Sequence, residues 1–258
     1  MIGPVILTYH ALSELPSPVC LSPRRFERQL QAFKMAGWES VSLSAVLDWL
    51  VLGKPLPSKA IAITFDDGYA STFSEAFPRL QSFGFVATVF LVSGYCGKSN
   101  RWPGQPAAIP ELPMLTWEEV AQLAEAGLEF GAHTHSHLPL VRLPLAQAQE
   151  EMVTSKNLLE ARTGKGMRLF SPPYGVSNRQ IEALIARHFD GSVSARLGRV
   201  SRKSGRYALP RVDAYYLSGD PLTFLDRPFA GLRFSLRNLA RGLRRRIRPD
   251  WDRIDSSE

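Results

Sequence analysis

The chain has 258 residues, 45% of them hydrophobic and 21% charged, so it is long enough for one large α/β domain or two smaller ones. Its two cysteines, Cys20 and Cys96, exclude a disulfide framework and a Cys-x-x-Cys metal site. The formal net charge is +7, of which +4 lies in residues 229–258, and the mildly basic remainder gives no reason to expect nucleic acid as a partner.

The first residues and the hydropathy of the chain bear on its compartment. Residues 1–10 carry no basic start, and their apolar run is too short for the central segment of a signal peptide. No stretch approaches the roughly 20 apolar residues that cross a bilayer. We therefore expect a cytoplasmic protein with reduced cysteines.

Apolar runs of strand character alternate with helical patterns along most of the chain. Strands are predicted over residues 5–9, 41–43, 61–65, 86–92, 128–132, 167–170 and 191–195. Helices are predicted over residues 22–37, 44–52, 70–83, 116–126, 144–163 and 177–187, with Ser22, Thr116 and Ser177 as N-caps. This alternation predicts an α/β fold built on a mainly parallel sheet or barrel, in a single domain.

The predicted strand over residues 61–65 stops abruptly at Asp66, Asp67 and Gly68. Adjacent residues of an extended chain point to opposite sides, so a turn at Gly68 is needed to bring both carboxylates to one cavity. Taken alone, such a motif is more often a turn with an Asp helix cap.

Other polar residues also follow predicted strands directly. His10, His133 and the Pro172–Gly175 turn occupy such positions, as does the Asp pair. In α/β barrels and open sheets the carboxyl ends of the strands form the face where ligands bind. We therefore expect these residues to share one site.

Three of the five histidines lie within residues 133–137. His133 and His137 are four apart, which places two imidazoles on one side of a helical turn and leaves His135 pointing to solvent or substrate. One strand-end carboxylate and two imidazoles leave open positions on a divalent ion, as catalysis requires. The combination predicts a metal site.

Three segments resemble known motifs in their order and spacing. Residues 64–69, 133–137 and 172–175 are similar to the first three motifs of the polysaccharide deacetylases, the NodB-homology carbohydrate esterases of family 4. The openings at 7–10 and 114–117 are similar too, and the resemblance covers residues 4–213. It implies a distorted (β/α) barrel over residues 1–220, followed by a basic extension over 221–258, and metal-dependent removal of acetyl groups from N-acetylated sugars.

The resemblance also implies roles for individual residues. Asp67, His133 and His137 would hold the divalent ion, with zinc preferred over cobalt, nickel, manganese or iron. Asp66 would be the general base. The N–H of Tyr174 would help to hold the oxyanion, next to Pro173 in the substrate-binding turn.

Three departures from the family pattern are visible. The third motif usually begins with an arginine, and Ser171 stands in that place. Arg211 either supplies the missing guanidinium in the substrate site or is a surface arginine beside a strand. The fourth, tryptophan-bearing motif is not recognisable, so Trp102 or Tyr215 either walls the sugar site or belongs to the core.

The general acid is the remaining departure. Many relatives use a late histidine to protonate the leaving amine, but none follows His188, which ends a predicted helix. His10 is the candidate acid, and a core histidine bonded to backbone is the alternative.

Residues 229–248 combine an apolar helical stripe with arginines that lie mostly off it. Such a helix either contacts an anionic membrane surface peripherally or packs on the barrel with solvated arginines. For the chain as a whole, the alternatives to a sugar deacetylase are a non-catalytic carbohydrate-binding relative and a deacetylase of non-sugar N-acyl or O-acetyl substrates.

Overall fold

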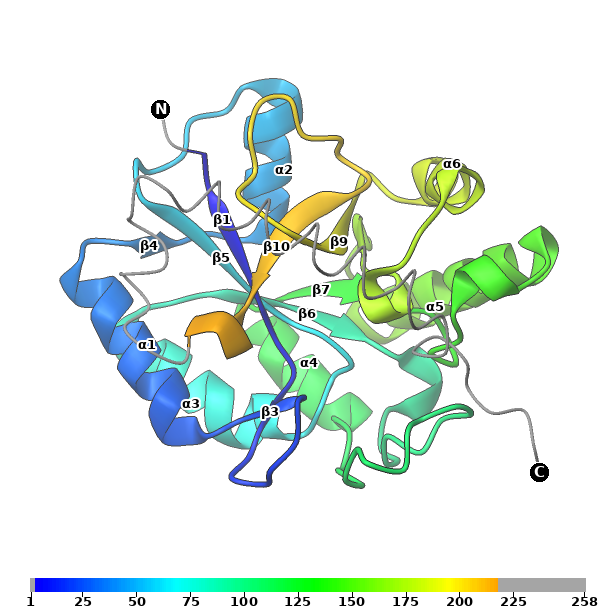
Figure 1. Ribbon diagram of the computed structural model, residues 1–258, viewed down its shortest axis with the longest axis horizontal. Coiled ribbons are helices and arrows are strands. Elements are labelled where there is room, and N and C mark those ends of the chain that lie inside the picture. Colours follow the sequence, from blue (N-terminus) through cyan, green and yellow to red (C-terminus); the bar gives the residue numbers. More distant parts are fainter. Residues whose placement is uncertain (1–2, 218–258) are drawn as a thin grey trace, which may run out of the picture.

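A computed structural model describes residues 3–217 and shows a parallel barrel surrounded by helices (Figure 1). The larger sheet has eight strands in the order β1-β10-β9-β8-β7-β6-β5-β4. Because β1 also pairs with β5, from Val5↔Ile61 to Tyr9↔Phe65, seven of these strands close into a ring and β4 is an extension beside the start of β5. All of the pairings are parallel, as predicted for a distorted (β/α) barrel.

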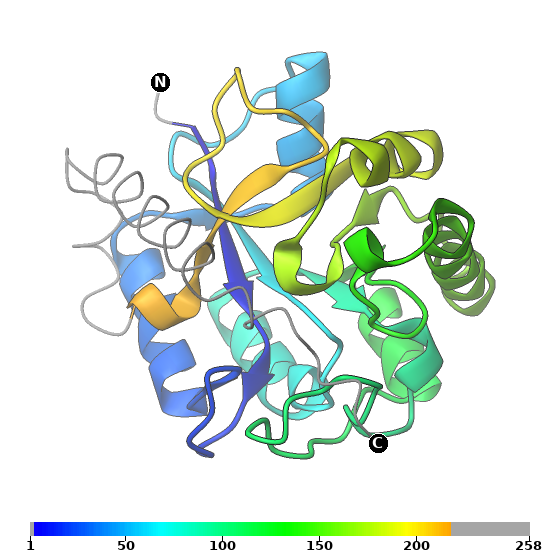
Figure 2. The same ribbon diagram turned by 45° about the vertical axis from the view of Figure 1, so that its right-hand side comes forward.

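The elements alternate along the chain much as the hydropathy pattern predicts. The strands are β1 (Val5–Tyr9), β2 (Ala11–Leu12), β3 (Cys20–Leu21), β4 (Glu39–Ser40), β5 (Ala60–Phe65), β6 (Ala87–Leu91), β7 (Glu129–Ala132), β8 (Leu169–Phe170), β9 (Gly191–Leu197) and β10 (Leu209–Asp213). The α-helices are α1 (Pro23–Met35), α2 (Leu43–Leu52), α3 (Phe77–Phe83), α4 (Trp117–Glu125), α5 (Leu145–Thr163) and α6 (Arg179–His188). Most of them form an outer layer in Figure 1 and Figure 2.

Local predictions differ from the structure in several places. The strand predicted over residues 41–43 lies at Glu39–Ser40 instead, because Ser42 is already the N-cap of α2. The helix after the Asp pair begins as a π-helix, Thr72–Ala76. Asn178, not Ser177, caps α6, since its side chain accepts the Ile181 N–H. The strand β10 was missed altogether.

Alternate residues of each strand have different neighbours. Val5, Leu7 and Tyr9 belong to the large core cluster that includes the helix faces, whereas Ile6 belongs to the cluster inside the ring. The same inner cluster holds one residue from each of β5, β6, β8, β9 and β10, namely Ala62, Phe90, Leu169, Val193 and Leu209. Because side chains alternate along a strand, the inward set continues toward the carboxyl ends at every second residue.

The two ends of the barrel differ. Leu43, Val46 and Leu47 of α2 pack into the inner cluster, so α2 closes the end where the strands begin (Figure 1). At the other end the inward set becomes polar. The barrel is therefore filled by apolar side chains at the end where its strands begin, and it is open at the end where they finish.

The predicted boundary between a barrel over residues 1–220 and an extension over 221–258 lies outside the described residues. Within residues 3–217 no helix has the length and apolar character that crossing a membrane requires.

Candidate metal-dependent active site

A cavity of about 330 Å³ opens at the carboxyl ends of the barrel strands. Many of the residues that line it belong to the inward-facing set of a strand, because every second side chain of a strand points to the same face. Asp66 continues the inward set of β5 after Ala62 and Thr64. Arg211 and Asp213 continue that of β10 after Leu209. The predicted site residues that line it are His10, Asp66, Asp67, His133, His137, Tyr174 and Arg211.

Three donors for a metal ion converge in this cavity. The Nε2 atoms of His133 and His137 lie 3.2 and 3.3 Å from the same Oδ1 of Asp67. Zinc bonds of 2.0–2.2 Å in tetrahedral geometry place neighbouring donors about 3.3 Å apart. The donor set, all buried, therefore fits a divalent ion in both spacing and chemistry.

The turn that separates the two aspartates begins one residue earlier than expected. Asp67 itself adopts φ 72°, and Gly68 follows with φ 89°. A Cβ on Gly68 would lie 2.3 Å from Cδ2 of the buried Leu91 side chain, and this close contact together with the positive φ favours glycine there. This reversal turns both carboxylates into one cavity, and left-handed backbone at a residue such as Asp67 costs about 1–2 kcal/mol.

His133 and His137 do not lie on a helix, so the reasoning from helical spacing was wrong. Thr134 and His137 have φ 66° and 59°, and the irregular turn between them folds the second imidazole back beside the first. His135 does not line the cavity; it is half-buried, and its Nδ1 lies 3.1 Å from Ser93 Oγ.

Ser171 orients the first imidazole. Its carbonyl oxygen lies 2.6 Å from His133 Nδ1. A carbonyl can only accept, so Nδ1 carries the proton and Nε2 keeps its lone pair for a metal. The second imidazole, His137, is covered by the Trp102 ring at a centroid distance of 4.2 Å.

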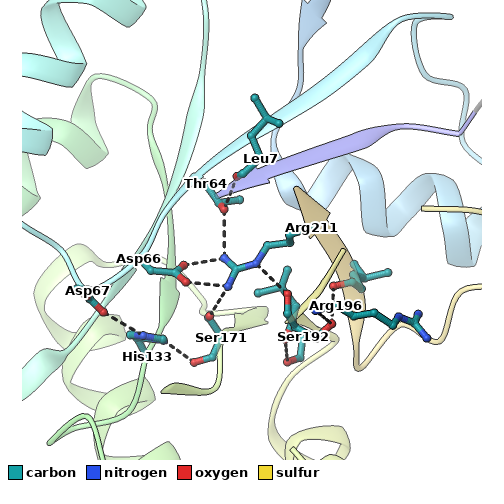
Figure 3. Close-up of polar contacts among 12 residues, drawn as sticks. Leu7, Thr64, Asp66, Asp67, His133, Ser171, Ser192, Arg196 and Arg211 are labelled. Carbon is teal, nitrogen blue, oxygen red and sulfur yellow. Dashed lines mark hydrogen bonds and ion pairs between the residues drawn. The ribbon is translucent and has the colours of Figure 1, made fainter. Parts of the chain in front are cut away.

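Arg211 is a buried partner of Asp66 rather than a surface arginine. Its Nη1 and Nη2 each donate to one carboxylate oxygen of Asp66 at 2.7 Å, as Figure 3 shows. Arg211 also donates to Thr64 Oγ1 and to the Ser194 carbonyl, and its Nη2 lies 3.4 Å from Ser171 Oγ. The guanidinium is thus held by four residues and presented to Asp66 in a rigid, two-bond geometry.

The charges of the site follow from these contacts. Burial alone would raise the pKa of Asp66, but the Arg211 guanidinium outweighs it and holds that pKa below its ordinary value. Burial likewise opposes ionisation of Asp67, and the His133 and His137 hydrogen bonds keep its pKa well below the usual range. Burial lowers the pKa of His137. At His133 burial is outweighed by the hydrogen bond to Asp67 and the charges of both aspartates, which raise the pKa. A metal requires the ionised carboxylate and neutral imidazoles, so its binding would compete with protonation of His133.

The Pro172–Gly175 turn borders the cavity from the side of β8. Tyr174 has φ 61°, and its half-exposed ring lies 4.9 Å from the His137 ring. The turn is closed by the Gly175 and Val176 N–H groups, which bond to the Pro172 and Pro173 carbonyls. Within this turn the Pro173 side chain is buried and does not line the cavity.

Sequence reasoning missed several contributors to the site. Gln105, Pro106 and Ile109 of the segment between β6 and α4 line the cavity beside Trp102, which the sequence did offer as a wall of the sugar site. The loop is ordered by Asn100, which accepts the Leu112 N–H and donates to the Pro110 carbonyl. Trp102 therefore belongs to both the core and the site.

Two other residues considered from the sequence lie elsewhere. His188 is the last residue of α6, and it does not line the cavity. Its carbonyl accepts a hydrogen bond from Lys156 Nζ. The side chain of Tyr215 is not among those that the structure describes. His10, directly after β1, lines the cavity.

The chain is similar to known proteins over most of its length. The family profile described as polysaccharide deacetylase matches residues 53–188, more than half of the chain. The matched region includes both aspartates, both ligand histidines and the Pro-Pro-Tyr-Gly turn.

Individual relatives cover most of the chain. It is 29% identical over 208 residues to YxkH of Bacillus subtilis, spanning 80% of this chain and 70% of that protein. It is 24% identical over 202 residues to the poly-beta-1,6-N-acetyl-D-glucosamine N-deacetylase of Staphylococcus epidermidis, spanning 74% and 67%. The structure of IcaB from Ammonifex degensii superposes with a TM-score of 0.73 at 23% identity, covering 82% and 92%, which supports the barrel fold.

Proposed function

The chain belongs to the polysaccharide deacetylase family, and on this premise we propose that it is a metal-dependent hydrolase that removes N-acetyl groups from an N-acetylated glycan. The products are acetate and a free amine. One observation carries the proposal: three metal donors meet beside an aspartate that is free of the metal set and paired with a buried arginine. A sugar-binding relative without catalysis would have no need of that aspartate.

Asp67, His133 and His137 would hold the ion, and we propose zinc, because imidazole and carboxylate ligands with an open position suit it. Cobalt, nickel, manganese and iron are compatible with the same donors. When bound, the ion polarises the acetyl carbonyl and lowers the pKa of a water molecule from 15.7 to about 7.

Asp66 is proposed as the general base. Arg211 keeps its carboxylate ionised and fixes its orientation through both oxygens. A carboxylate with a lowered pKa is a weak base, but a weak base is sufficient for a water whose own pKa has fallen. The remaining lone pairs of Asp66 are available to take the proton of that water.

The other two roles fall to opposite walls of the cavity. We propose that the Tyr174 N–H donates to the oxygen on which negative charge collects, since a backbone donor in a fixed turn needs no reorganisation. His10 would give a proton to the leaving amine, from its position after β1. Without that proton the C–N bond would have to break with an unstable amide anion as leaving group.

The shape of the site favours an oligomeric or polymeric glycan over a single sugar. A second cavity of about 300 Å³ adjoins the first and shares Thr8, His10, Val19 and Asp213 with it. A sugar that reacts at the metal can therefore have its neighbour in the second cavity. The name of the Staphylococcus epidermidis relative, an N-deacetylase of poly-beta-1,6-N-acetyl-D-glucosamine, points to the same substrate class.

The decisive experiment is acetate release from N-acetylglucosamine oligomers of increasing length by the metal-loaded protein. We expect turnover that rises with length, stops with a chelator and returns with zinc. A protein that binds metal and oligomer but releases no acetate would establish the non-catalytic alternative. Faster release from O-acetyl esters or non-sugar N-acyl amines would shift the substrate class and keep the chemistry.

A peripheral position at the inner face of the membrane is a further part of the proposal. It depends on residues 229–248, which lie outside the described residues, and on their alternation of leucines and arginines. Pelleting with anionic liposomes at low and high salt tests it. A variant with Arg237, Arg241 and Arg244 changed to Glu should stay in the supernatant, whereas equal pelleting of both proteins would refute membrane contact.

A further inference from the structure

The two histidine ligands are joined by a short segment with an unusual backbone. We call residues 133–137 the metal loop. Two of its residues, Thr134 and His137, have positive φ although neither is glycine. A loop in this conformation needs contacts from outside to hold it, because the left-handed region is unfavourable for both residues.

Glu151 of α5 provides one such contact. Its Oε2 accepts the N–H groups of His135 and Ser136 at 2.9 and 2.8 Å. The residue is 9% exposed, and none of the ion pairs found among residues 3–217 includes it. A buried carboxylate is retained where it satisfies groups that would otherwise lack partners, and here these are two consecutive amides of the metal loop.

The opposite side of the metal loop rests on the segment after β6. The Gly94 N–H donates to the His135 carbonyl at 2.9 Å, and the Ser93 N–H donates to the Thr134 carbonyl at 3.2 Å. A Cβ on Gly94 would lie 2.6 Å from the His135 oxygen. This side therefore holds the carbonyls of the loop, while Glu151 holds its amides.

His133 and His137 depend to different degrees on these contacts with the metal loop. His133 has anchors of its own, since its N–H bonds to the Leu91 carbonyl and its ring bonds to the Ser171 carbonyl. Among the residues that the structure describes, the partner of the His137 N–H is Thr134 Oγ1, within the metal loop itself. The backbone of His137 is therefore placed by the shape of the loop, and its ring then packs against the rings of Trp102 and Tyr174.

We propose that Glu151 is a positioning residue for the metal site, which sets the position of His137 relative to Asp67 and His133 through the backbone of the metal loop. The inference rests on the metal site of the proposed function but not on its substrate. Loss of the Glu151 carboxylate should release His137 and leave a site with two firm ligands and one loose one.

The test is the zinc affinity of purified Glu151→Ala, measured by competition with a chromophoric chelator. Loss of a group that orients a ligand typically weakens metal binding by about 10–100-fold, and we expect a loss in this range. The visible spectrum of the cobalt-loaded variant should change as well, because coordination at His137 becomes looser. Saturating zinc should recover much of any deacetylase activity.

Three further variants complete the test. Glu150→Ala removes an exposed carboxylate from the neighbouring position of α5 and should bind zinc like the unaltered protein. Glu151→Gln keeps an oxygen acceptor for both amides and should fall between Glu151→Ala and the unaltered protein. Glu151→Met has a similar volume without an acceptor, and it replaces the alanine variant if that one fails to fold.

Zinc affinity within twofold of the unaltered protein in a folded Glu151→Ala or Glu151→Met would overturn the proposal. So would failure of both to fold, since Glu151 would then hold the fold rather than the metal loop. Because zinc binding is measured without substrate, inactivity of the protein on every glycan would reject the proposed function and leave this result unaffected.

Discussion

The two halves of the active site are built in different ways. The proposed metal half consists of Asp67, His133 and His137, which follow strands β5 and β7 and belong to short, contiguous motifs. The proposed base half pairs Asp66 with Arg211, which lies 145 residues further along the chain. The first half is visible in the sequence, and the second exists only in the closed barrel.

The difference shows which parts of the site can change position. Metal donors must be particular atoms at particular distances, so each ligand is tied to its motif. The proposed base needs a guanidinium at one place in space, and an arginine either directly after β8 or on β10 can reach that place. Ser171, after β8, occupies the place of the family arginine and still touches the Arg211 guanidinium that comes from β10.

The largest effect should come from breaking the metal half. His133→Ala should lose bound zinc and lower turnover by at least about a thousandfold, because the ion supplies several kcal/mol of transition-state stabilisation. Metal analysis and acetate release measure the two losses. His135→Ala is the matched control, since it removes an imidazole from the same loop but not from the donor set.

The base half should fail without losing the metal. Asp66→Asn removes the proton acceptor while it leaves Asp67, His133 and His137 in place, so we expect full zinc content and a loss of about 10²–10⁴-fold in turnover. Loss of zinc equal to that of His133→Ala would contradict the separation of the two halves.

Removal of the guanidinium should affect stability as well as rate. Arg211→Met leaves the buried Asp66 carboxylate without its partner, which typically costs about 3–5 kcal/mol in the free energy of unfolding. Arg168→Met is the control, because Arg168 also bonds to two carboxylates, of Asp48 and Asp190, but at the surface. Chemical denaturation should show a loss of no more than about 1 kcal/mol there.

The same variant makes a prediction about pH. The folded-state pKa of Asp66 is lowered, so its pairing stabilises the protein above the unfolded carboxyl pKa of about 3.9, and this contribution is lost as pH falls through the folded-state pKa. The stability gap between the unaltered protein and Arg211→Met should therefore narrow on acidification. The acidic limb of kcat/KM should move to higher pH in Arg211→Met, and an unmoved limb would contradict the pairing.

The smallest effect should be a partial rescue. In the double variant Ser171→Arg with Arg211→Met, the guanidinium returns to the place that the family pattern gives it. We expect part of the activity of Arg211→Met to be recovered, because Ser171 Oγ and the Arg211 guanidinium are already neighbours. Ser171→Lys with Arg211→Met is the control, since an ammonium carries the charge but lacks the planar pair of parallel N–H groups that matches the two oxygens of Asp66. No recovery with arginine would show that the position of the guanidinium is not exchangeable.

Much of the fold and the metal half could be predicted from local patterns. Apolar runs place most strands within a few residues, and the polar residues that follow them predict the ligand-binding face. Strand β10 was missed because Leu-Pro-Arg-Val-Asp contains a proline and two charges, which is unusual for a buried strand. Its pairing with β9 shifts register between Leu209 and Arg211, which accommodates that proline.

The three proposed metal donors can be named from local motifs alone, because the residue types of Asp67, His133 and His137 suit only a few chemistries. The tertiary structure decided their geometry, through a turn that begins at Asp67 and an irregular loop instead of a helix. It also decided that Arg211 faces Asp66. Parallel closure places β10 beside β1, and alternation along β10 then points every second side chain inward, which depends on contacts between residues too distant in sequence for a local pattern to record.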